Sequence, residues 1–124
     1  MRVAVCVVVL AVSLVTAASA SGAYRDKYCS PTGDYCTSAT RSAGAVKLRL
    51  ATFSFSGRYK LCVKRAGGVQ TCKTFRLVRR SSRWVSEVTW YKQFPNGGTG
   101  IYTATWFYGG ARLGPPLTFA VANS

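Results

Sequence analysis

After residue 20, apolar and polar residues alternate with a period of two in most segments, which is typical of β-strands that bury one face. The clearest case is the stretch 94–121. The apolar faces of its two strands consist of Tyr102, Ala104, Trp106, Tyr108, Leu117, Phe119 and Val121. Because Gly109-Gly110 lies between these strands and glycine adopts the dihedral angles of tight turns, the stretch predicts a β-hairpin.

The segment 45–55 predicts a half-buried strand with Lys47 and Arg49 on its solvent side. Phe53 and Phe55 fall on the same side as these cations. We therefore expect a bulge or a bend near Ala51 to turn both rings inward.

A second hairpin is predicted at 58–78, with a glycine-containing turn at 66–68. This turn places Cys62 opposite Cys72 on the outer face. Four cations share that face, namely Arg58, Lys60, Lys64 and Arg76. The segment 78–83 is expected to be a polar connection and 84–90 a further strand.

Strands recur along the chain at short intervals, and no stretch has a helical period of useful length. This pattern predicts an all-β fold, an antiparallel β-sandwich of about seven or eight strands.

Residues 1–20 have the layout of a secretory signal peptide, because Arg2 precedes an apolar run and small residues follow up to Ala20. Cleavage after Ala20 would remove Cys6. We expect residues 21–124 to form a single extracellular domain without stable insertion in a membrane.

Four cysteines remain after this cleavage, and an even number in a secreted chain predicts two disulfides. The local pairs Cys29 with Cys36 and Cys62 with Cys72 are favoured, because each pair encloses its own turn. Crossed pairings between the two sets stay open. The cysteine spacings and the absence of histidine argue against zinc.

The segment from Gly100 to Ala104, which follows a glycine-rich turn, resembles the tyrosine corner of immunoglobulin-like domains. The resemblance implies an immunoglobulin-like sandwich in which the Tyr102 hydroxyl bonds to the backbone of the corner. The layout of turns and cysteines is also similar to small secreted actinobacterial proteins of uncharacterised function. These likenesses rest on turns and disulfides, so they imply no activity.

The sequence has few candidate residues for acid–base catalysis, which uses titratable groups with a pKa near neutrality. It has no histidine, and its three acids are Asp26, Asp34 and Glu87. Asp34 lies in the predicted turn 30–34, where aspartate commonly bonds to the backbone. We therefore expect no catalytic residue, metal or cofactor, and an enzyme is only a remote alternative.

The net charge of +14 predicts attraction to anionic partners. The candidate residues for binding a polyanion are Lys47, Arg49, Arg58, Lys60, Lys64 and Arg76. Export makes nucleic acid an unsuitable partner, so an anionic cell-wall polymer or an acidic glycan fits better. Two alternatives remain, a protein partner bound through a sheet, and a solvated basic face that only keeps the domain soluble.

Overall fold

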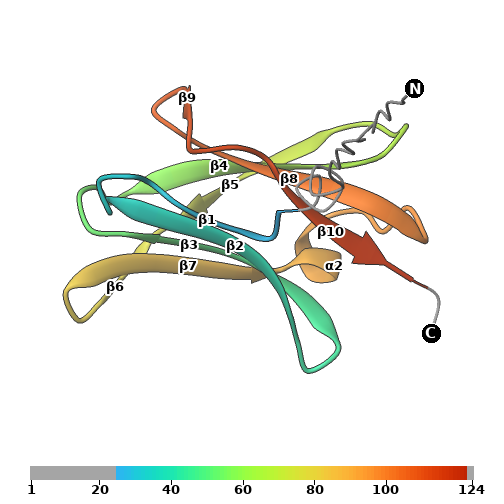
Figure 1. Cartoon of the computed structure of the whole chain (residues 1–124), viewed down its shortest axis with the longest axis horizontal. Coiled ribbons are helices and arrows are strands. Elements are labelled where there is room, and N and C mark those ends of the chain that lie inside the picture. The colour runs from blue at the N-terminus through green and yellow to red at the C-terminus, as the bar shows by residue number, and fades with distance from the viewer. Residues whose placement is uncertain (1–24, 123–124) are drawn as a thin grey trace, which may run out of the picture.

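The computed structural model describes residues 25–122, so the predicted signal peptide and Cys6 lie outside the described residues. Two antiparallel sheets form two layers (Figure 1), which confirms the predicted all-β sandwich. Sheet A has the order β1-β2-β3-β7-β6, and sheet B has the order β10-β8-β4-β5 with β9 beside β8. The strands are β1 (Lys27–Cys29), β2 (Tyr35–Ser42), β3 (Ala45–Thr52), β4 (Arg58–Arg65), β5 (Thr71–Arg76), β6 (Val78–Arg80), β7 (Arg83–Thr89), β8 (Gly100–Tyr108), β9 (Ala111–Arg112) and β10 (Leu117–Val121), and the helical turn α2 spans Trp90–Gln93.

The core lies between the two sheets and uses the apolar parity of each strand. Leu48 and Leu50 from β3 face Leu61 and Trp106 from sheet B, and all four side chains are fully buried. Each such side chain contributes about 1.5–3 kcal/mol through its burial. The alternation in the sequence therefore identified the faces that hold the sheets together.

The turn before β8 is fixed by hydrogen bonds to its carbonyl groups. The Tyr102 hydroxyl donates to the carbonyl oxygen of Gly98 at 2.7 Å, as the tyrosine-corner resemblance implies. Arg65 donates from Nε and Nη2 to the Thr99 carbonyl oxygen at 2.9 and 2.6 Å. The close approach of the Arg65 side chain to the backbone of this turn requires glycine at position 100. There φ is +146°, and an added Cβ would lie 2.9 Å from Arg65 Nε.

The end of β3 differs from the prediction. β3 keeps one continuous register with β2 and with β7 as far as Thr52, without a bulge. The expected bend is present directly after the strand, at Phe53 and Ser54. The Thr52 hydroxyl then accepts a hydrogen bond from the Phe55 amide at 3.1 Å, which ends the strand. Phe55 packs against Tyr108, with ring centroids 4.2 Å apart, whereas Phe53 is 53% exposed. The prediction that both rings turn inward is wrong for Phe53.

The predicted connection 78–83 is a hairpin instead. Arg80 pairs with Arg83 across the turn at Ser81 and Ser82, and Ser81 has a positive φ of 59°. β6 thus adds an edge strand to sheet A and places its exposed cations beside β7.

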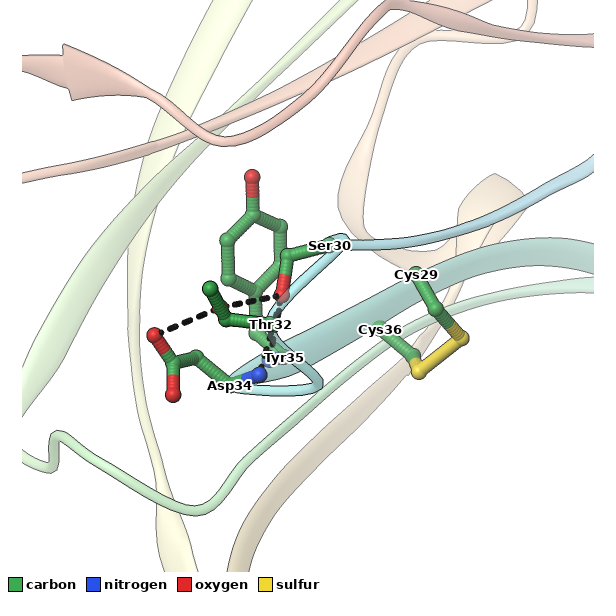
Figure 2. Close-up of a disulfide and its surroundings, with 6 residues drawn as sticks. All are labelled: Cys29, Ser30, Thr32, Asp34, Tyr35 and Cys36. Atoms are coloured by element: carbon green, nitrogen blue, oxygen red, sulfur yellow. Dashed lines mark hydrogen bonds between the residues drawn. A yellow bond between two sulfur atoms is a disulfide. The ribbon is translucent and has the colours of Figure 1, made fainter.

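Two disulfides join Cys29 to Cys36 and Cys62 to Cys72, the local pairing favoured by the sequence. In the first hairpin the Ser30 hydroxyl accepts a hydrogen bond from the Asp34 amide at 2.9 Å (Figure 2). Figure 2 also shows the disulfide and Tyr35 on opposite sides of this hairpin.

Disulfides are typical of proteins in oxidising environments such as the cell exterior. Within residues 25–122, no helix is long and apolar enough to cross a membrane.

Candidate functional site

A row of short side chains crosses the outer face of sheet A from one edge to the other. The strand registers place these residues side by side on all five strands, in the order Cys29, Cys36, Ala51, Val85 and Val78. The first two are joined by a disulfide. We call this row the floor.

The residues that flank the floor on both sides lie two positions along each strand and so share its orientation. Except for Ser38, their side chains are longer than those of the floor. One flanking row contains Lys27, Ser38, Arg49 and Glu87, with Arg76 at its end, and the other contains Phe53, Arg83 and Arg80. The difference in side-chain length hollows the face. We call the floor and its two flanking rows the sheet A groove.

The groove consists of two adjoining hollows of about 610 Å³ and 440 Å³. Both are lined by Arg49, Arg83 and Glu87, so they form one depression. Five strands spaced by about 4.8 Å give a length of roughly 19 Å, and the four residue steps from Arg49 to Phe53 give a width of roughly 13 Å at the backbone. These dimensions suit one extended polymer chain that crosses the strands.

Positive charge dominates this depression. Its cations are Lys27, Arg49, Arg76, Arg80 and Arg83, and its one carboxylate belongs to Glu87. Glu87 is the cross-strand partner of Arg49, and neighbours of opposite charge in a sheet attract one another. The planar guanidinium group binds carboxylate and phosphate oxygens through two parallel hydrogen bonds. The groove can therefore hold a row of oxyanions.

The predicted polyanion-binding residues are divided between two surfaces. Lys47 and Arg49 lie on the outer face of sheet A, where Lys47 Nζ donates to Thr89 Oγ1 at 2.8 Å. Arg76 pairs with Arg58 and also lines the end of the groove. The remaining residues, Arg58, Lys60 and Lys64, lie on the outer face of sheet B.

The groove also uses residues that the sequence analysis did not propose as binding residues, namely Lys27, Phe53, Arg80 and Arg83. A signal for two of them was present, since Val78 and Arg80 are two positions apart, as are Arg83 and Val85, on either side of a pair of serines. This is the period of two around a short turn that marks a hairpin. The Phe53 position follows from the end of β3 at Thr52, which the sequence pattern did not reveal.

The outer face of sheet B is also basic but has a different surface. Lys60 Nζ lies 4.9 Å from the centroid of the Phe107 ring, so the cation covers the aromatic side chain. Beside them is a hollow of about 280 Å³. Next to the second disulfide, Thr105 is the cross-strand neighbour of Cys62.

The sheets are also joined beneath the groove. The Tyr59 hydroxyl from β4 donates to Ser86 Oγ in β7 at 2.8 Å, and Ser86 lines the larger hollow. Burial raises the pKa of Tyr59 to about 12, although the hydrogen bond to Ser86 opposes the shift.

Within residues 25–122, no group of three or more His, Cys, Asp or Glu side chains is placed to hold a metal ion.

No protein-family model matches the sequence, and none of the curated proteins matches it. Among solved structures, the chain is similar to a Br derivative of BhCBM56, a carbohydrate-binding module. The TM-score is 0.45 at 19% identity, over 77% of this chain and 99% of that chain. A similarity of this size carries no argument about the ligand of this chain.

Proposed function

We propose that this protein is a non-catalytic extracellular binding module that holds an anionic polymer, such as a cell-wall polymer or an acidic glycan, in the sheet A groove. The observation that carries the proposal is the gathering of five cations around one hollow that crosses every strand of a sheet. Each cation that neutralises an anionic group releases counterions, so binding by several cations is strong and weakens as the salt concentration rises.

The position of the exposed apolar side chains favours this partner over a protein. The large ones within residues 25–122 are Phe53, Val69, Val78 and Tyr91. Phe53 and Val78 line different hollows of the groove, Val69 follows the turn between β4 and β5, and Tyr91 lies on α2. Protein interfaces are marked by larger contiguous apolar patches.

Two variants with equal net charge test the proposal. The groove variant replaces Arg49, Arg80 and Arg83 with glutamine, and the matched control replaces Arg58, Lys60 and Lys64 with glutamine. Calorimetry with a short heparin-derived oligosaccharide should show at least a tenfold, about 1.4 kcal/mol, loss of affinity for the groove variant. The control should stay close to the unmodified protein.

The salt dependence gives a second readout. In the groove variant the slope of log affinity against log salt should decrease by up to about one unit for each arginine that no longer pairs with an anionic group of the ligand. Equal losses of affinity in both variants would mean that overall charge, and not the groove, attracts the oligosaccharide, and the proposal would then fail.

A further inference from the structure

Phe53 lies at the edge of the groove floor and leaves half of its surface in solvent. The side chain is 53% exposed and lines the same hollow as Ala51 and the disulfide between Cys29 and Cys36. Its amide donates to the Asp34 carbonyl oxygen at 2.9 Å, which ties this residue to the neighbouring hairpin. An aromatic residue with an anchored backbone is thus presented to solvent inside a basic groove.

Other aromatic rings near cations are used within the protein. Among residues 25–122, cations lie over the rings of Tyr28, Phe107 and Trp84. Phe53 takes part in none of these contacts and in none of the aromatic pairs of the described residues, although Arg49 and Arg83 line the same hollow. The ring is therefore available to a ligand.

The groove combines two kinds of surface at a fixed spacing. The floor and Phe53 are apolar, and the cations stand in rows on both sides of the floor. A sugar ring has C–H groups on its faces and polar substituents at its edges, so it can pack on an apolar surface while its edges reach cations on both sides. Inorganic polyphosphate carries charge on every unit and has no apolar face that would contact the floor.

From this arrangement, and building on the function proposed above, we infer that the ligand of the groove is an acidic polysaccharide. One sugar ring packs on Phe53 and the adjoining floor, and carboxylate or sulfate groups of the same chain bind Arg49 and Arg83. Ring packing and ion pairing thus act on one polymer, and both are required for full affinity.

The test compares Phe53→Ala with Tyr91→Ala, because the two side chains have nearly the same exposure, 53% and 52%. The probes are a short heparin-derived oligosaccharide, an oligogalacturonate and inorganic polyphosphate. Phe53→Ala should lower the affinity for both saccharides by about tenfold, in keeping with the loss of one aromatic contact. Its affinity for polyphosphate should stay within about twofold of that of the unmodified protein. Phe53→Trp should retain saccharide binding, and Tyr91→Ala should change none of the affinities.

The melting temperature of each variant shows that the fold is intact, which is expected because both side chains are exposed. The inference is overturned if Phe53→Ala leaves saccharide affinity unchanged, or if it lowers the affinity for polyphosphate as much as that for the saccharides. The proposed polyanion site would stand in either case. A groove glutamine variant that retains all binding would instead overturn the proposed function itself.

Discussion

The two outer faces of the sandwich share a plan and differ in shape. Each has a disulfide between neighbouring antiparallel strands, with Cα atoms 4.0 Å apart, and each has cations in the rows beside it. On sheet A, Ala51 and Val85 continue the disulfide row as a low floor. On sheet B, Lys60 lies over Phe107 in the adjoining row.

The difference between the faces shows that charge does not by itself make a binding site. Opposed sheets lie about 10 Å apart, and exposed charges at 0.15 M salt are screened over about 8 Å. The two basic faces therefore act as separate surfaces. In the part of the chain that the structure describes, the sheet A face is the one of the two that combines cations with a long hollow and an uncovered aromatic ring.

Removal of the disulfides has the largest expected effects, and comparing the two bonds distinguishes an effect on stability from an effect on binding. They close loops with sequence separations of 7 and 10 residues. In the chain-entropy model, loss of either bond costs about 2.5–3 kcal/mol of unfolding free energy. Replacing each pair with alanine should lower the urea midpoint to a similar extent, but only the Cys29 and Cys36 variant should also lose oligosaccharide affinity. Equal binding losses would show that the first disulfide is not a distinctive part of the floor.

High pH should weaken the connection between the faces through Tyr59. Its pKa is raised from 10.0 to about 12, so the folded state binds the proton more tightly than the unfolded chain does. This contribution is complete below pH 10 and is lost as the pH rises through 12. A shift of this size corresponds to about 3 kcal/mol.

Urea unfolding at stepped alkaline pH, monitored by tryptophan fluorescence, measures this loss. Tyr59→Phe cannot ionise, so its stability should fall less steeply in this range, although it lacks the hydrogen bond to Ser86 at lower pH. Parallel pH profiles for the two proteins would contradict the assignment to Tyr59.

The shape of the floor can be changed without changing charge. Ala51→Leu raises the floor next to the first disulfide, and Thr105→Leu changes the equivalent position next to the second. The Ala51 variant should bind the heparin-derived oligosaccharide about tenfold, or 1.4 kcal/mol, more weakly. Thr105→Leu should bind it normally, and equal affinities would mean that the depth of the groove is unimportant.

The smallest effect is expected at Lys60. Lys60→Gln removes the cation from the Phe107 ring and should lower the free energy of unfolding by about 0.5 kcal/mol, the value for an exposed cation–π contact. Oligosaccharide affinity should be unchanged at high salt. A clear loss of affinity there would place the ligand on sheet B.

Sequence reasoning identified the sandwich because the burial of Leu48, Leu50 and Trp106 requires a period of two that is visible in the chain. The resemblance of the segment from Gly100 to Ala104 to the tyrosine corner of immunoglobulin-like domains also anticipated the hydrogen bond of the Tyr102 hydroxyl to the turn.

The candidate site was less predictable. Its cations come from β1, β3, β6 and β7 and the end of β5, and the pairing of β3 with β7 joins segments far apart in the chain. Parity along single strands could show that Arg49 and Arg58 face solvent, but not that they face opposite ways. That outcome depends on which sheet each strand joins.

The most direct test of the proposed site is amide chemical-shift mapping with a short heparin-derived oligosaccharide. We predict that the largest shifts follow the groove, at Arg49, Ala51, Phe53, Arg83 and Val85, and that the amides around Cys62 and Thr105 move little. Shifts centred on the outer face of sheet B, or spread evenly over both faces, would contradict the claim that the hollow of sheet A is the binding site.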